Sequence, residues 1–465
     1  MALTITPSVD RAAVLDRFRR MRARTRALFD LLDERVYYDR PIPLRNPVVF
    51  YEGHLPAFAV NTLLKRALGG AGVDPVLEEI FARGIDPETE AAAVARGNPA
   101  WPSRAAVHAY AAAADRAIES AIASADLEVT GHPTLHRAQA LWTILEHEEM
   151  HQETLAYMWH EVPYAHKRKP PDSSALPAFN SRTEGTPELG VDEQVAIPAG
   201  VATLGTGDDE PFAWDNEVPS HTVDVPAFVI DRHNVTNAQF MAFVDAGGYG
   251  DQRWWSPEDQ AWIAEDGVRH PRFWERDGGR WYWRGMFERV ALPEHWPVWV
   301  TWAEARAYAR WRGMRLPTEA EFHRAAFGSP GEVEADLQVR GGDRRYPWGD
   351  VLGPRPRGNF DFLRWDPEPV GSHPEGASAF GVHDLVGNGW EWTSTPFGPF
   401  DGFVPAASYP EYSADFFDGN HFVMKGASPV TARELVRRGF RNWFRPRYPY
   451  VYASFRCAAS TDGRP

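Results

Sequence analysis

The stretch PTLHRAQALWTILEHEEMHQETLAYMW (residues 133–159) places apolar side chains three and four residues apart, the spacing of one helix face. Pro133 suits the first turn of a helix, because its missing N–H would have no partner there. Segments 11–35 and 103–125 show the same spacing, and the second is rich in alanine, which favours helix. The sequence therefore predicts an antiparallel bundle of three or four long helices in the first 160 or so residues.

The pattern changes after this region. Residues 166–190 are polar and rich in Pro, Ser and Gly, which is typical of a linker. Beyond them come short β-like runs, many turn residues, dense aromatics and one amphipathic helix at 302–313. We therefore expect an α+β protein with a helical bundle over 1–165, a linker over 166–190 and a second, irregular domain over 191–465.

Composition narrows the class of protein. The 465 residues carry a net charge of -15, which argues against nucleic-acid or anionic-membrane partners, because both require a cationic face. No apolar run approaches the roughly 20 residues of a membrane span, and no apolar signal segment is visible in the first 35 residues. The single cysteine, Cys457, excludes an internal disulfide. These features predict a cytoplasmic protein.

Two histidines in the opening stretch are candidates for metal ligands. His147 and His151 are four residues apart, so a helix directs both imidazoles to one side. In a metal site, nearby glutamates could accept hydrogen bonds from the imidazoles and fix their tautomers: Glu146, Glu148, Glu149 and Glu153. The alternative is that both histidines are solvated on an acidic helix face. A zinc peptidase would use Glu148 as general base, but Tyr157 stands where the longer pattern has its third histidine.

A third histidine is available upstream. His54 follows Gly53 at what we expect to be the start of a helix, and a bundle can bring a ligand from one helix to a pair on another. Three neutral imidazoles leave coordination positions open, which suits either Fe(II) oxygen chemistry or a catalytic zinc. His132 and His136 form a poorer pair, because His132 precedes Pro133 at or outside the helix start.

Five strings in the second half carry a family resemblance: 229–249, 297–326, YPWGD (346–350), GVHDLVGNGWEWT (381–393) and SFRCA (454–458). Together they resemble the formylglycine-generating-enzyme domain, a variant of the C-type-lectin-like fold. Cys457 lies in the last string, where we expect a buried structural residue rather than a nucleophile.

With a DinB-like bundle carrying the GH and HEEMH motifs, nearly the whole chain resembles the sulfoxide synthases of ergothioneine biosynthesis. The resemblance implies an Fe(II) site held by His54, His147 and His151. It also implies the activity, which joins a thiol sulfur to the imidazole C2 of hercynine with O2. Two further readings stay open: a zinc-dependent DinB-like hydrolase or thiol transferase, and a non-catalytic lectin-like module.

The resemblance implies substrate contacts and also shows departures. Asn442 and Trp443 correspond to hercynine contacts, and a quaternary ammonium is recognised by aromatic faces. Phe444 and Tyr448 replace the Asp and Arg that bind γ-glutamylcysteine in one branch of the family. Cysteine is therefore the expected donor, and a selenosugar, which would give selenoneine, is the alternative. The candidate donor contacts are Arg445 and Arg447.

Two more positions bear on the chemistry. Met150 stands where relatives have a glutamine that hydrogen-bonds the substrate imidazole, and methionine can only pack there. The family also uses a tyrosine near the iron as proton donor, and this sequence has Phe400 in the corresponding loop. We therefore expect Tyr448 or Tyr450 to take that catalytic role.

Overall fold

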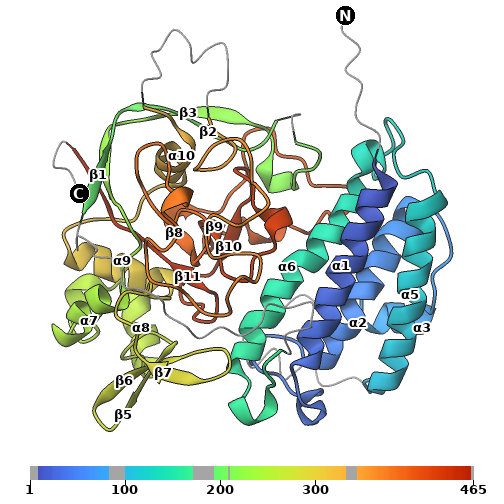
Figure 1. Cartoon of the computed structure of the whole chain (residues 1–465), viewed down its shortest axis with the longest axis horizontal. Coiled ribbons are helices and arrows are strands. Elements are labelled where there is room, and N and C mark those ends of the chain that lie inside the picture. Colours follow the sequence, from blue (N-terminus) through green and yellow to red (C-terminus); the bar gives the residue numbers. More distant parts are fainter. Residues whose placement is uncertain (1–8, 83–99, 171–192, 208–209, 331–342, 462–465) are drawn as a thin grey trace, which may run out of the picture. The chain divides into compact units, whose positions relative to one another are not determined.

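The computed structural model describes residues 9–82, 100–170, 193–207, 210–330 and 343–461 (Figure 1). The chain forms two compact units. The helical unit comprises Met1–Ala178 and Pro405–Tyr412, and the mixed unit comprises Phe179–Val404 and Ser413–Pro465. Most of the predicted linker, from 171 onward, lies outside the described residues.

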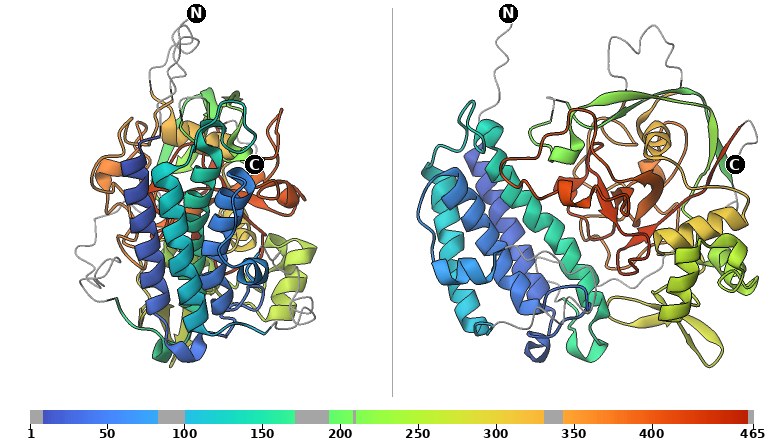
Figure 2. Two further views of the ribbon diagram at one scale, coloured as in Figure 1. Left: turned by 90° about the vertical axis from the view of Figure 1, so that its right-hand side faces the viewer. Right: turned by 180° about the vertical axis from the view of Figure 1, so that it is seen from behind.

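The helical unit is built from long helices that lie side by side (Figure 2). Helix α1 packs against α5 and α6, and α2 packs against α5. A π-helical segment, Val60–Ala67, continues α2. The predicted bundle is confirmed, with helices α1 (Arg11–Asp30), α2 (Val48–Ala59), α3 (Pro75–Ile80), α5 (Arg104–Ser124) and α6 (Gln139–Glu161). None of the helices in the described ranges is long and apolar enough to cross a bilayer.

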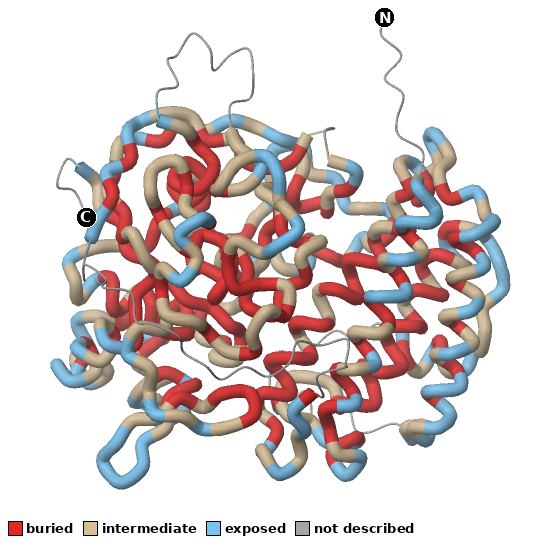
Figure 3. The backbone as a smooth tube through the Cα atoms, viewed as in Figure 1, coloured by how far each residue is buried: buried red, intermediate tan, exposed pale blue. Residues whose placement is uncertain are grey.

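The inward sides of the bundle helices are buried (Figure 3). Asp10 caps α1 by accepting hydrogen bonds from the backbone N–H groups of Ala12 and Ala13, which supplies partners that the helix itself cannot. Side chains at helical spacing then meet in one cluster, which includes Val14, Phe18, Met21, Leu63, Ile118, Ile122, Leu141 and Leu145. Burial of this apolar surface stabilises the bundle.

The structure corrects two helix boundaries. Helix α6 begins at Gln139 and not at Pro133, because Arg137 and Ala138 have positive φ angles of 52° and 55°. The turn before it is closed by His132, whose Nδ1 accepts from the backbone N–H of Thr134. His54 lies in the interior of α2 rather than at a helix start.

The helices of the mixed unit begin at capping boxes. In each, a Ser or Thr side chain accepts from the backbone N–H three residues later, and the side chain at that position reaches back. These helices are α7 (Asn237–Asp245), α8 (Pro257–Asp266), α9 (Trp302–Trp311) and α10 (Glu319–Phe327). Helix α9 is the amphipathic helix predicted at 302–313.

Short strands form four small sheets among the described residues of this unit. The largest has the order β10-β9-β8-β11, with β11 parallel to β8 and the other pairs antiparallel. Its strands are β8 (Gly389–Pro396), β9 (Phe422–Ala427), β10 (Asn442–Phe444) and β11 (Ala453–Ser454). The predicted α+β class is confirmed.

The other three sheets are smaller and contain only antiparallel pairs. One is formed by β1 (Gln194–Ile197), β4 (Phe228–Asp231) and β12 (Ala458–Ser460), a second by β2 (Gly200–Leu204) and β3 (His221–Val225), and a third by β5 (Trp274–Asp277), β6 (Arg280–Arg284) and β7 (Arg289–Ala291).

The SFRCA string is structural. Arg456 is fully buried, forms a bidentate ion pair with Glu391, and donates to three backbone carbonyls. The neighbouring Cys457 is also buried, and burial raises the pKa of its thiol, so a thiolate is disfavoured. Cys457 is therefore a core residue, as the sequence predicts.

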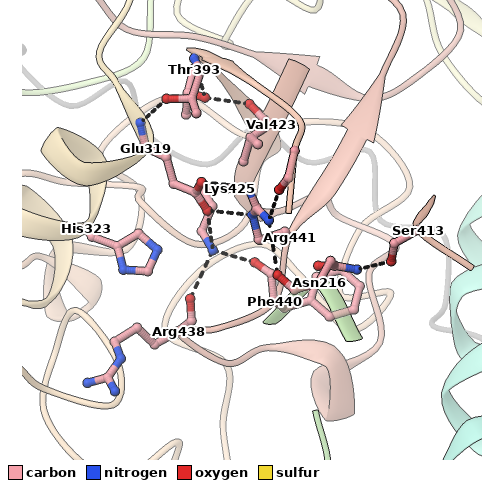
Figure 4. Close-up of polar contacts among 12 residues, drawn as sticks. Asn216, Glu319, His323, Thr393, Ser413, Val423, Lys425, Arg438, Phe440 and Arg441 are labelled. Atoms are coloured by element: carbon pink, nitrogen blue, oxygen red, sulfur yellow. Dashed lines mark hydrogen bonds and ion pairs between the residues drawn. The ribbon is translucent and has the colours of Figure 1, made fainter. Parts of the chain in front are cut away.

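A buried polar cluster fixes the chain just before β10 (Figure 4). Lys425 on β9 donates to the carbonyls of Arg438 and Phe440, at 3.0 and 2.5 Å. Arg441 forms a two-pronged ion pair with Glu319 of α10, at 3.0 and 3.1 Å. Because each charge is paired or hydrogen-bonded, the cluster holds the backbone that leads into Asn442.

The charge of Lys425 should make stability depend on pH. Burial lowers the pKa of Lys425 to about 8, below its ordinary 10.5, so the folded protein loses this proton before the unfolded chain does. Between these two values stability rises with pH, by about 3 kcal/mol at most from this group. Urea unfolding at pH 7.5 to 10 should therefore show a difference between the wild type and Lys425→Met that grows with pH. Lys169→Met, at an exposed lysine of the helical unit, serves as the control, and a flat difference for Lys425→Met would contradict the prediction.

Candidate metal centre

Helix α6 presents two histidines on one face. The rings of His147 and His151 lie one helical turn apart, with centroids 4.5 Å from each other. Met150 is on the same side of the helix, because it is three residues from His147 and next to His151. This face of α6 therefore offers two imidazoles and a polarisable thioether.

Helix α2 supplies the third histidine. The His54 ring is 5.3 Å from both other rings, and the ligand atoms of the three imidazoles all lie within 4.8 Å of one another. Across the ranges that the structure describes, this is the one group of three or more His, Cys, Asp or Glu side chains that could hold a metal ion. The structure thus brings together the three residues that the sequence singled out.

Aromatic packing fixes the rings. Phe50 stacks on His54 at 4.9 Å, and Phe58 stacks on His147 at 3.5 Å. Phe50, His54 and Phe58 follow one another at four-residue intervals on α2, so one helix face carries the ligand and its packing partners. His54 and His147 are 4% and 3% exposed, which keeps this part of the site largely dry.

The packing of Phe81 explains why a glycine precedes His54 in the GH motif. The Nδ1–H of His54 donates to the carbonyl of Phe81 at 2.9 Å, which fixes the tautomer and leaves Nε2 as the metal-binding atom. A Cβ on Gly53 would collide with the Phe81 ring. Only glycine lets Phe81 come close enough to orient the histidine beside it.

The electrostatics favour neutral ligands. Burial, reinforced by the neighbouring imidazoles, lowers the pKa of His147 well below its ordinary value, and burial does the same for His151. Both rings keep a buried Nδ1 without a hydrogen-bond partner among the described residues. Neutral imidazoles whose ligand atoms lie within 4.8 Å of one another fit a divalent metal ion.

The glutamates of α6 face other partners. Glu148 accepts from Arg22 and Thr25 of α1 at 2.8 and 2.6 Å, and Glu149 is paired with Arg17. The expectation that these two glutamates orient the histidines is therefore wrong, because arginines of α1 engage their carboxylates. A peptidase mechanism is excluded as well, since its general base, Glu148, is held in an ion pair.

Sequence reasoning missed a second group of residues near the histidines. The segment Pro405–Tyr412 belongs to the helical unit, although its neighbours in the chain belong to the mixed unit. The Tyr409 ring lies 5.9 Å from His147 and 5.1 Å from Phe58, and the Tyr412 hydroxyl donates to Met150 Sδ at 3.1 Å. No local signal reveals this arrangement, because it joins residues more than 250 positions apart.

The candidate hercynine contacts lie on a sheet edge of the mixed unit. Asn442 and Trp443 open β10, which pairs with β9 in antiparallel register. Trp443 stacks on Phe397 at 4.1 Å with an interplanar angle of 6°, and Phe416 lies 5.7 Å away. These three rings form an aromatic wall of the kind that attracts a quaternary ammonium.

The remaining predicted residues cluster just after this wall. Phe444 and Tyr448 stack on one another at 5.0 Å, and Tyr450 meets Tyr448 edge to face. Arg447 forms an ion pair with the buried Asp259 at 3.0 Å, so α8 holds this guanidinium. The positions that would carry a charged clamp are thus occupied by a pair of packed aromatic rings.

Comparison with known proteins places this architecture. Residues 17–155 match the DinB superfamily, and residues 180–461 match the sulfatase-modifying factor enzyme 1-like domain. The expected combination of a DinB-like bundle and a formylglycine-generating-enzyme domain is confirmed. The fold and the histidine cluster define a two-domain protein with a candidate metal centre in its DinB-like domain.

Full-length relatives identify the family. The chain is 35% identical to the hercynine oxygenase of Mycolicibacterium thermoresistibile, over 95% of this chain and 93% of that protein. It is equally similar to the hercynine oxygenase of Mycobacterium tuberculosis, over 94% and 96% of the two chains. Ergothioneine biosynthesis protein 1 of Neurospora crassa is 26% identical, over 92% of this chain and 55% of that protein. The chain belongs to the hercynine oxygenase family.

Two substitutions on α6 should separate metal binding from helix packing. His151→Ala removes one of the three candidate ligands and should weaken binding of a divalent metal ion by more than about 100-fold, beyond the usual loss when only a supporting residue is removed. Glu148→Gln should leave metal affinity unchanged and lower the free energy of unfolding by up to about 3–5 kcal/mol, because Arg22 loses a buried partner. Anaerobic titration with Fe(II) and urea unfolding measure the two effects. Loss of metal binding in Glu148→Gln would show that the carboxylate serves the site.

Proposed function

We propose that this protein uses O2 to join a thiol sulfur to the imidazole C2 of hercynine, giving the sulfoxide from which ergothioneine is made. The observation that carries the proposal is the convergence of His54, His147 and His151, in a chain whose relatives of similar length are hercynine oxygenases. The thiol S–H and the C2–H bonds break, and an S–C and an S=O bond form. The second oxygen atom leaves as water, so O2 takes up four electrons.

The three histidines would hold Fe(II). They supply three neutral nitrogen ligands, a number that leaves positions for thiol, imidazole and O2. When bound there, Fe(II) supplies a redox-active centre that activates O2 and brings both substrates together. Phe50 and Phe58 pack against the ligand rings and limit the access of water.

Hercynine binding is assigned to the edge of the mixed unit's largest sheet. Trp443 and Phe416 offer aromatic faces for the trimethylammonium group, which cannot donate hydrogen bonds, and the buried Phe397 stacks against Trp443. Asn442 stands at the same strand end and supplies an amide for the carboxylate or imidazole. Met150 packs beside the histidines without a hydrogen bond to the substrate, so orientation of the imidazole falls to other residues.

The thiol donor is proposed to be cysteine. Phe444 and Tyr448 stack on each other in place of the charged pair that γ-glutamylcysteine would need. Arg445 and Arg447 are the candidate cysteine contacts, and the guanidinium of Arg447 also binds Asp259. Residues of this kind recognise a carboxylate through charge-assisted hydrogen bonds.

The proton donor is proposed to be a tyrosine. Tyr448 and Tyr450 are the candidates from the sequence, and Tyr409 and Tyr412 are those that lie beside the histidines within the helical unit. We prefer the second pair, because its contacts with His147 and Met150 lie within the helical unit. A phenol hydroxyl there can donate a proton to the oxygen that leaves as water.

The proposed location of the protein is the cytoplasm, where hercynine and free thiols coexist.

The activity is tested with iron-loaded protein, hercynine and a thiol in air. We expect O2 consumption and a product with the mass of the cysteine–hercynine sulfoxide, both lost in His54→Ala. Parallel reactions with γ-glutamylcysteine and a selenosugar identify the donor by the product's mass. If no thiol or selenol leads to O2 consumption with hercynine, the proposed function is wrong.

The aromatic wall is tested separately. Trp443→Ala removes the face stacked on Phe397 and should raise the KM for hercynine by about 10-fold, in line with a cation–π contribution of roughly 1–2 kcal/mol. The KM for the thiol should change little. The substitution Trp254→Ala, on an exposed 3-10 turn of the same unit, serves as control. Equal KM values for hercynine in the wild type and Trp443→Ala would remove Trp443 from the binding site.

A further inference from the structure

Ser408 is the fixed point of the segment Pro405–Tyr412. It is completely buried, although the residues on both sides of it are not. Its hydroxyl is hydrogen-bonded to that of Thr143 at 2.8 Å, and its carbonyl accepts from Arg66 at 2.9 Å. Ser408 is therefore tied at its side chain and its backbone to two different parts of the helical unit.

Both ties lead directly to the helices of the histidine cluster. Thr143 is one helical turn before His147 on α6, so the two side chains share a face. Arg66 lies in the π-helical segment that continues α2, two turns beyond Phe58. Arg66 itself is exposed, and its guanidinium reaches the carbonyl of the buried Ser408 through a charge-assisted hydrogen bond.

Backbone turns in the rest of the segment fix the positions of the two tyrosines relative to Ser408. Tyr409 follows Ser408 directly, and its backbone N–H donates to the carbonyl of Ala406 at 3.0 Å. A second turn runs from the Tyr412 N–H to the Tyr409 carbonyl at 3.2 Å. With two successive turns and one buried anchor, the segment has little freedom to move the Tyr409 ring away from His147 or the Tyr412 hydroxyl away from Met150.

We propose that Arg66, Thr143 and Ser408 form a positioning anchor that holds Tyr409 and Tyr412 at the histidine cluster and thereby determines which product the enzyme makes. The proposal rests on the proposed function. With the tyrosines in place, O2 is used to form the S–C and S=O bonds and one water. When they are displaced, the thiol alone reacts with O2, both oxygen atoms enter the sulfinate (RSH + O2 → RSO2H), and hercynine is left unchanged.

The anchor is tested first without metal or turnover. In Arg66→Gln, deuterium uptake in a peptide covering 405–412 should rise, while uptake in α1 and α5 stays that of the wild type. Arg11→Gln is the matched control, because Arg11 also donates to a backbone carbonyl, that of Ile122, elsewhere in the bundle. Unchanged uptake over 405–412 in Arg66→Gln would overturn the proposal, because the segment would not depend on the anchor.

Product analysis then tests the consequence. With hercynine and cysteine in air, the ratio of cysteine sulfinate to sulfoxide should rise about 10-fold in Arg66→Gln and in Thr143→Val, which corresponds to roughly 1.4 kcal/mol between the two outcomes. Tyr412→Phe and Tyr409→Phe give the ratio for a lost hydroxyl, and the anchor variants should move toward it. Iron affinity should stay at the wild-type value, because no ligand changes.

Matched variants separate positioning from simple destabilisation. Thr431→Val removes a buried hydroxyl that is paired with Ser428 in the mixed unit, and it should leave the product ratio unchanged. In the double variant Thr143→Val/Ser408→Ala neither hydroxyl is left unsatisfied, so stability should recover while the ratio stays raised. A ratio that recovers with stability, or that never changes in an active enzyme, would overturn the anchor. Absence of any O2 consumption in the wild type would instead refute the proposed function.

Discussion

The convergence of three imidazoles from α2 and α6 is the constraint around which the helical unit is built. Buried histidines must remain uncharged, because desolvation disfavours the protonated form, and His147 and His151 accordingly have strongly lowered pKa values. Neutral rings at contact distance are useful only if something binds their lone pairs. The close helix approach, the stacked phenylalanines and the carbonyl of Phe81 all serve to hold this otherwise costly arrangement.

On helix α6, the candidate metal ligands and the glutamates that form stabilising ion pairs lie on different faces. His147 and His151 lie toward α2, whereas Glu148 and Glu149 are paired with arginines of α1. An H-E-x-x-H motif therefore carries no peptidase chemistry here, because the glutamate is a structural partner. The same letters describe two different sites, and the difference depends on what the neighbouring helix presents to the middle residue.

The mixed unit contributes in two ways. Its largest sheet holds Asn442 and Trp443 on β10, and the buried cluster of Lys425, Arg441 and Glu319 fixes the approach to that strand (Figure 4). Along the chain, it also flanks a short segment, Pro405–Tyr412, that belongs to the helical unit.

The sequence alone determined the features that depend on neighbours within a few residues. Helical periodicity predicted the bundle and α9, and the four-residue spacing predicted that His147 and His151 share a face. Short motifs identified both domains and the role of Cys457. Helix boundaries were less certain, because the positive φ angles of Arg137 and Ala138 leave no mark in the apolar pattern.

Only the tertiary structure decided the features that join distant parts of the chain. That Glu148 pairs with Arg22, that Phe81 orients His54, and that Ser408 bonds Thr143 depends on how the backbone returns to a helix after tens or hundreds of residues. Such contacts arise from tertiary packing, in which many side chains could occupy the same space. The local pattern of apolar and polar residues does not determine which of these side chains makes the contact. The sequence thus determined which residues share a helix face, and the tertiary structure determined which residues pack against that face.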